Sequence, residues 1–154
     1  MPASAAARFA AAYAALNASH TVGDHIVQLD HDAVRKGLPG TEGRAACARH
    51  VATYTATQAL TLAGVNHTLR LGLTPRGIAA ALALSAATHY AIDRSGGRWA
   101  EDPDTQPTTA LVRTAHRLGK GQWLQRDPQA GYRYDQALHK GILLVASLAA
   151  STRS

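Results

Sequence analysis

A chain of 154 residues can form one domain with its own core, and it is too short for two domains of ordinary size. Hydrophobic residues make up 46%, yet there is only one Phe and one Met, and much of the remainder is alanine. Because alanine is the best intrinsic helix former, this composition predicts an all-α fold with a thin core. The single cysteine, Cys47, excludes an intramolecular disulfide framework.

The formal net charge is +6, and arginine carries most of the excess because lysine occurs only at positions 36, 120 and 140. Guanidinium groups pair well with phosphate and carboxylate, so an anionic substrate is expected; a basic surface that only keeps the protein soluble is the alternative. No segment reaches the ~18 uninterrupted apolar residues of a membrane-spanning helix. We expect a cytoplasmic protein that at most adheres to a membrane surface.

The first predicted helix covers residues 4–30, and the second runs from 41 or 42 to 63, before Gly64 as a candidate C-cap. Thr74 and Pro75 are favoured N-cap and first-turn residues, so a third helix is expected from there to about 93. Residues 94–133 are polar and turn-rich, with a short helix at 108–118, and are interpreted as a lid. A fourth main helix is expected at 134–150. Together these elements predict an up-and-down four-helix bundle with a long polar loop and a short extra helix.

Side chains of metal-ligand type recur along these helices. They are His20, Asp24, His50, His89, Asp93, Asp135 and His139. Six of them form three pairs spaced i,i+4, which places both members of a pair on one helix face. In an up-and-down bundle, the end of an odd helix lies beside the start of the next even one. All seven therefore map to the same end of the bundle, within a single metal-binding domain that covers residues 1–154.

Imidazole and carboxylate groups together suit zinc, manganese or iron, and the sequence does not choose among them. Seven ligands are too many for one ion, so either two ions bind close together or some of the residues orient the others. Cys47 could be a further ligand, although a buried inert thiol is favoured. A ferritin-like di-iron site is disfavoured because Glu42 and Glu101 are the only glutamates. The alternative to a metal site is a set of unrelated surface or capping groups.

The motifs read in order as His20-x3-Asp24-x3-Gln28, His50-x3-Tyr54, His89-x2-Ile92-Asp93 and Asp135-Gln136-x2-His139. This set resembles a bacterial family of domains of unknown function, often membrane-associated, whose short motifs have the same order and spacing. More distantly, it is similar to small helical metal-dependent hydrolases of bacterial membranes. The resemblance spans His20 to about Leu144, and it implies that Gln28, Tyr54 and Gln136 belong to the same polar centre. It implies no particular reaction.

The leading hypothesis is a metal-dependent hydrolase that acts on a phosphorylated or other anionic substrate with a metal-activated water. His50 would be a ligand or a general base, and Gln28 and Tyr54 would orient water or substrate. Four arginines that flank the third and fourth helices would hold the anion: Arg94, Arg98, Arg126 and Arg133. A nucleic-acid substrate is kept as an alternative.

A second hypothesis is a non-catalytic module. In it, a structural metal or a His/Asp network holds the helices together, and the surface binds a protein, a nucleic acid or a membrane. An oxygen-using non-haem iron enzyme is a third hypothesis. The oligomeric state is not predicted.

Overall fold

The computed structural model describes residues 3–152, and every regular element within them is helical. This confirms the all-α prediction. The elements are α1 (Ala5–Val22), a π-helical turn η1 (Gly23–Val27), α2 (Asp30–Ala33), α3 (Gly40–Thr68), α4 (Pro75–Asp93), α5 (Ala110–Arg117), α6 (Gly121–Arg126) and α7 (Ala130–Ser151).

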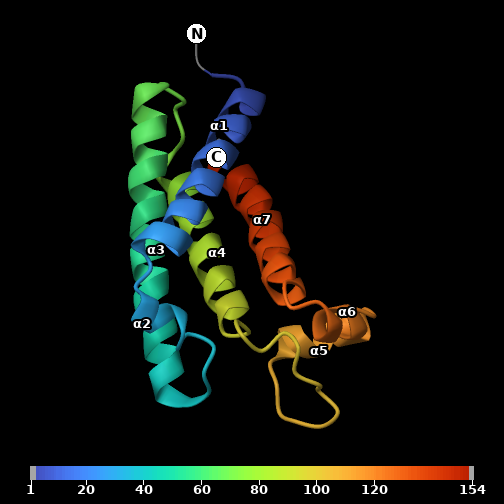
Figure 1. The fold of residues 1–154 in the computed structure, drawn as a ribbon. Helices are drawn as coiled ribbons and strands as arrows, with labels where there is room; N and C mark the ends of the chain where they lie inside the picture. The colour runs from blue at the N-terminus through green and yellow to red at the C-terminus, as the bar shows by residue number, and fades with distance from the viewer. Residues whose placement is uncertain (1–2, 153–154) are drawn as a thin grey trace.

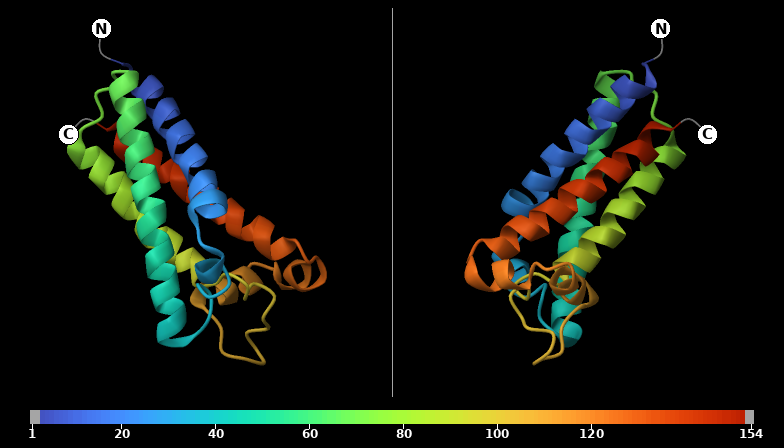
Figure 2. Two further views of the ribbon diagram at one scale, coloured as in Figure 1. Left: turned by 60° about the vertical axis from the view of Figure 1, so that its left-hand side comes forward. Right: turned by 90° about the vertical axis from the view of Figure 1, so that its right-hand side faces the viewer.

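Four long helices, α1, α3, α4 and α7, run in alternating directions and lie side by side (Figures 1 and 2). Helix α4 packs against α3 and α7, and α1 packs against the same two helices. The short helices α2, α5 and α6 all lie toward the end of the molecule where α1 stops and α7 begins (Figure 1). None of the helices in the described part of the chain is both long enough and apolar enough to span a membrane.

The caps explain why several predicted boundaries agree with the structure. The hydroxyls of Ser4, Thr74 and Thr109 accept hydrogen bonds from the first turns of α1, α4 and α5. Helix α4 therefore covers the predicted 74–93 segment, and α5 covers the predicted short helix.

Other boundaries were wrong. The first helix leaves helical geometry at Gln28, after η1, and α2 and α6 were not predicted. Helix α7 begins at Ala130, four residues before the predicted start of 134. Gly64, the predicted C-cap, lies inside α3, which continues to Thr68. Within the predicted lid, residues 110–117 and 121–126 are helical.

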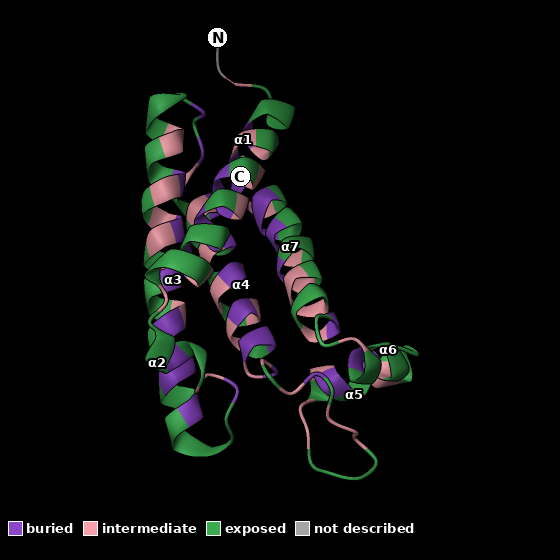
Figure 3. Ribbon diagram, viewed as in Figure 1, coloured by how far each residue is buried: buried purple, intermediate pink, exposed green. Residues whose placement is uncertain are grey.

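Two apolar clusters lie on either side of a polar layer. The larger is rich in alanine: Ala12, Ala15, Leu16, Leu62, Leu71, Leu73, Ala81, Leu143, Ala146 and Ala150. The smaller joins α5, α6 and the start of α7 to the end of α4: Ile92, Trp99, Val112, Ala115, Leu124 and Ala130. The inner helix faces are buried along this whole length (Figure 3). Along α4 and α7, the buried residues between the two clusters are Ser85 and His89 on α4 and His139 on α7.

A close backbone contact fixes the loop after α2 against the loop after α4. A Cβ at Gly37 would overlap the carbonyl oxygen of Gly96, so only glycine allows this approach. The guanidinium of Arg94 reinforces the contact by donating to the carbonyl oxygens of Lys36 and Leu38. The two loops therefore place Lys36 beside the end of α4.

Candidate metal centre

The structure brings all seven predicted metal ligands together. Each of the four long helices contributes at least one of them, and the π-helical turn η1 contributes Asp24. Their donor atoms form three overlapping or adjacent groups: His20 with His89 and His139, Asp24 with His50 and His89, and Asp93 with Asp135 and His139. Within each group the donor atoms all lie within 4.8 Å of one another.

The centre of the site is a pair of facing imidazoles on α3 and α4. The Nε2 atoms of His50 and His89 are 2.9 Å apart. Asp24 Oδ1 lies 3.4 Å from each of these nitrogens, and Asp93 Oδ2 lies 3.2 Å from each. Ligands bound at 2.0–2.1 Å to a tetrahedral zinc are about 3.3 Å from one another. The Asp24 oxygen and the two imidazole nitrogens are therefore spaced like ligands around a single small cation.

The second oxygen of each carboxylate points toward a further histidine. Asp24 Oδ2 lies 3.6 Å from Nε2 of His20, and Asp93 Oδ1 lies 3.5 Å from Nε2 of His139. Asp135 Oδ2 approaches the same His139 nitrogen at 3.4 Å. Asp24 and Asp93 can thus bridge the His50–His89 pair to a second group of ligands.

The imidazoles and carboxylates of the site are deeply buried, so they have lost most of their contact with water. The side chains of His20, His50, His89 and Asp93 are each at most 1% exposed. Asp24 Oδ1 and Asp93 Oδ2 are buried and take part in no hydrogen bond of normal geometry within the described residues, although Asp93 Oδ2 is paired with the Lys36 ammonium at 3.0 Å. Removing a carboxylate from water is costly unless it is paired or bound to a cation. Asp24 Oδ1, which has no lysine or arginine of residues 3–152 beside it, is therefore suited to bind a cation.

Burial and charge move the pKa values of the histidines in opposite directions. Burial lowers the pKa of His20 to about 4 and lowers that of His89. Burial also disfavours charge on His139, but contact with Asp135 and Asp93 outweighs it and raises the pKa to about 9. His50 behaves in the same way, since the neighbouring carboxylates raise its pKa.

Both bridging carboxylates stay ionised. Burial alone would raise the pKa of Asp24, but the adjacent histidines bring it to about 2. The pKa of Asp93 is held well below its usual range by the three histidines that surround it. Ionised carboxylates next to imidazole nitrogens are the state in which these residues bind a divalent metal.

Tyr54 was expected to orient water or substrate, but its hydroxyl has other partners. It lies 3.1 Å from the Ser85 hydroxyl and accepts a 2.7 Å hydrogen bond from Gln58 Nε2. The phenol ring stacks on His89 with the centroids 3.7 Å apart. Tyr54 does not line the pocket described below. We therefore assign it the role of holding the His89 ring in place.

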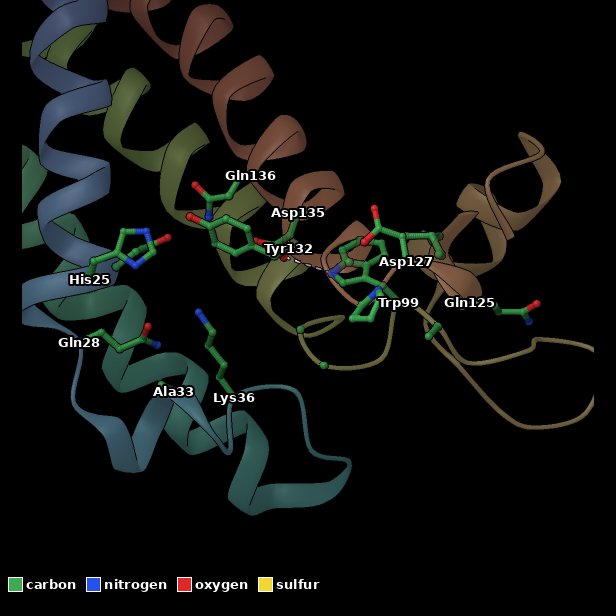
Figure 4. A pocket seen from close by; sticks show the side chains of 17 residues that line it. His25, Gln28, Ala33, Lys36, Trp99, Gln125, Asp127, Tyr132, Asp135 and Gln136 are labelled. Carbon is green, nitrogen blue, oxygen red and sulfur yellow. Dashed lines mark hydrogen bonds between the residues drawn. The ribbon is translucent and has the colours of Figure 1, made fainter. Parts of the chain in front are cut away.

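A pocket of about 580 Å³ opens next to the centre, between the η1–α2 segment and the α6–α7 segment (Figure 4). Asp24, Asp135 and Gln136 line it and also contact the histidines. Gln136 Oε1 is 3.2 Å from Nε2 of His20. Pockets of this size accommodate small-molecule ligands.

Lys36 and Gln28 lie at the boundary between this pocket and the centre (Figure 4). The Lys36 ammonium is 3.0 Å from Asp93 Oδ2. When the amide nitrogen of Gln28 faces the backbone of Asp24, it donates to the Asp24 carbonyl oxygen at 3.1 Å. The amide oxygen of Gln28 then accepts from Lys36 Nζ at 3.2 Å. Gln28 thus positions Lys36. His50 does not line the pocket, so it has the position of a ligand rather than of a general base.

The four arginines that were expected to hold an anion do not line this pocket. Arg94 binds backbone carbonyls, as described above. Arg98 pairs with Glu101 at 2.9 Å, and Arg133 pairs with Asp127 at 3.2 Å. Arg126 is exposed at the end of α6. Lys36 is the lysine or arginine that the structure places at the site.

Several residues of the site were missed by the sequence analysis. Trp99 lines the pocket and donates from Nε1 to Asp135 Oδ1 at 3.3 Å. His25 also lines the pocket, and its ring centroid is 6.3 Å from that of Tyr132. Lys36 had no sequence signal other than being one of three lysines. The motif spacing could have indicated Ser85, which precedes His89 by one helical turn.

Comparison with known proteins gives no match: the chain matches no family model, no curated protein and no solved structure.

Proposed function

We propose that this protein is a metal-dependent hydrolase with a centre for two divalent ions, zinc, manganese or iron(II), that acts on a small anionic ester. The four long helices would serve as an up-and-down four-helix bundle that holds the ligands. The observation that carries the proposal is the pair of carboxylates, Asp24 and Asp93. Each has one oxygen beside the His50–His89 pair and the other beside a further histidine.

The ligands divide into two groups around these carboxylates. His50 and His89 would hold one ion together with one oxygen each from Asp24 and Asp93. A second ion would be held by the remaining oxygens and by the other three ligands: His20, His139 and Asp135. Bound ions of this kind polarise a scissile group and lower the pKa of a coordinated water toward neutrality.

The position of the pocket supports a catalytic centre over a closed structural one. Catalytic metal sites keep one position open to water or substrate, whereas structural sites are saturated by protein ligands. Asp24, Asp135 and Gln136 face both the histidines and the pocket. The Asp135 side chain is 16% exposed, and Trp99 fixes its orientation at the edge of the pocket.

The proposal is tested by metal analysis of protein purified without added metal, followed by an assay of ester hydrolysis before and after a chelator. We expect about two equivalents of a transition metal, hydrolysis that depends on them, and helical circular dichroism that survives chelation. Asp93→Ala should bind clearly less metal than the parent. Absence of bound metal in the parent, even after incubation with zinc, manganese or iron(II), would falsify the mechanism.

One further outcome would favour the non-catalytic alternative. If chelation unfolds the protein and the metal-loaded form cleaves no ester, the centre holds the helices together and has no hydrolytic role.

A further inference from the structure

We propose that the pocket binds a phosphate monoester with an aromatic or apolar alcohol part, and that Lys36 holds the phosphate beside the metal centre. This inference rests on the proposed function, because the phosphate would lie against the same ions. It assigns the anion-binding role to a residue on the loop after α2.

Lys36 is placed to bind an oxygen of a substrate and a carboxylate of the centre together. Its ammonium is 3.0 Å from Asp93 Oδ2, and its side chain is 16% exposed. Gln28 binds the same ammonium from the pocket side. An ammonium has three N–H donors, so one remains for a phosphate oxygen in the pocket.

The charge of the centre matches a dianion. Asp24, Asp93 and Asp135 contribute three negative charges near the histidines. Two divalent ions and the Lys36 ammonium would contribute five positive charges, which leaves an excess of two. A phosphate monoester carries nearly two negative charges at neutral pH, since its second pKa is about 6. With one ion the excess would be zero, and the centre would not attract an anion.

The walls of the pocket suit an apolar group. Trp99, Leu124, Pro128 and Tyr132 are among the residues that line it. Trp99 is 3% exposed, and Tyr132 is 59% exposed at the rim. Aromatic and aliphatic walls with a few polar groups at one end are typical of sites for small ligands.

A nucleic-acid chain fits this pocket poorly. Strands of nucleic acid are held by several cationic groups that follow the backbone, whereas Lys36 is the single lysine or arginine among the described residues that line the pocket. One phosphate on an apolar group is therefore the favoured ligand.

The reaction is hydrolysis of the ester bond. The oxygen of a water molecule forms a bond to phosphorus, and the P–O bond to the alcohol part breaks with its electron pair on the alcohol oxygen. One proton of the water ends on that oxygen, so ester and water become inorganic phosphate and alcohol.

The test compares Lys36→Met with Lys120→Met, a matched change at an exposed lysine outside the pocket, in protein loaded with metal. Calorimetry would measure the Kd for inorganic phosphate. Hydrolysis would be measured on p-nitrophenyl phosphate, glycerol phosphate, the uncharged p-nitrophenyl acetate and a single-stranded oligonucleotide. Metal content is measured for each variant, and Lys36→Arg tests whether positive charge is sufficient.

We expect Lys36→Met to weaken phosphate binding about tenfold or more and to raise KM for both monoesters, because a charge-assisted contact is lost. Hydrolysis of the uncharged acetate should fall much less than hydrolysis of the monoesters, and Lys36→Arg should retain phosphate binding. The parent should prefer p-nitrophenyl phosphate to glycerol phosphate, and Tyr132→Ala, a change at an exposed wall residue, should reduce this preference.

Equal phosphate affinity in Lys36→Met and the parent overturns the inference, as does faster cleavage of the oligonucleotide than of the monoesters. If the loaded protein cleaves esters without any effect of Lys36, the proposed function stands and this inference fails. If phosphate binding depends on Lys36 but no ester is cleaved, the hydrolase proposal fails and the binding site remains.

Discussion

Asp24 and Asp93 approach the same two imidazole nitrogens from different elements. Asp24 Oδ1, on η1, and Asp93 Oδ2, on α4, each lie within 3.4 Å of Nε2 of both His50 and His89. Their other oxygens lie beside two different histidines. The carboxylates thus lie between the His50–His89 pair on one side and His20 or His139 on the other.

This sharing predicts unequal effects of substitutions on metal content. Asp24→Asn and Asp93→Asn should each lose most of both ions, because a bridging oxygen is replaced by an amide nitrogen in either group. His20→Ala and His139→Ala should each retain about one equivalent. The measurement is metal stoichiometry after gel filtration, with Asp30→Asn, an exposed aspartate at the start of α2, as the control. Full occupancy in Asp93→Asn, or complete loss in His20→Ala, contradicts two ions with shared carboxylates.

The stability of the metal-free form should fall as the pH rises, whereas the additional stability caused by bound metal should grow. The pKa of His139 is about 9 in the folded protein, against 6.5 without its neighbours. The folded state therefore retains a proton that the unfolded state loses. The resulting stability, on the order of 3 kcal/mol for such a shift, is fully present below pH 6.5 and is lost as the pH rises through 9. Metal requires the neutral imidazole, so stabilisation by metal grows over the same range.

Thermal unfolding between pH 6.5 and 9, with chelator and with excess metal, measures both trends. We expect the melting temperature to fall with pH in chelator, while the increase caused by metal becomes larger. His139→Gln should flatten the trend in chelator. A metal-free protein that becomes more stable from pH 6.5 to 9 would be inconsistent with a protonated His139.

Tyr54→Phe should reduce stability while leaving metal content unchanged. The substitution removes the hydroxyl that Ser85 and Gln58 contact in the core. Leaving buried polar groups without partners costs about 1–3 kcal/mol, which corresponds to a fall of several degrees in Tm for a chain of this length. Tyr132→Phe, at an exposed ring, is the matched control. A loss of metal in Tyr54→Phe without a fall in Tm would show that the Tyr54 hydroxyl contributes to metal binding.

The ligands could be located from the sequence because their positions depend on local regularities. The i,i+4 spacing of His89 and Asp93 puts them on one face of α4, and chain direction brings that end of the helix beside the start of α7. The same reasoning placed Tyr54 one turn from His50. It did not show that the Tyr54 hydroxyl points toward Ser85, because the direction of a side chain within a core depends on partners from another helix.

Lys36 could not be assigned from the sequence for a related reason. Its position depends on the loop that contains it, and this loop is held by Gly96 and Arg94, about 60 residues further along the chain. No periodic pattern in the sequence indicates such a long-range contact. The arginines that flank the helices looked suitable for an anion, but residues such as Arg133 find carboxylate and amide partners nearby in the chain.

Two glycine substitutions separate this loop contact from general effects on helix stability. Gly37→Ala places a methyl group against the carbonyl oxygen of Gly96, so the loop after α2 must move and carry Lys36 away from Asp93. We expect lower stability and the same weakening of phosphate binding as in Lys36→Met.

Gly64→Ala has open space around the new methyl group in the interior of α3, where alanine is favoured over glycine by about 0.5–1 kcal/mol. This variant should unfold at a higher temperature and bind phosphate like the parent. Both changes add one methyl group, so they can be compared directly. A loss of phosphate binding confined to Gly37→Ala would show that the loop contact holds Lys36 at the centre. Equal phosphate binding in the two variants would show that Lys36 reaches the pocket without this contact.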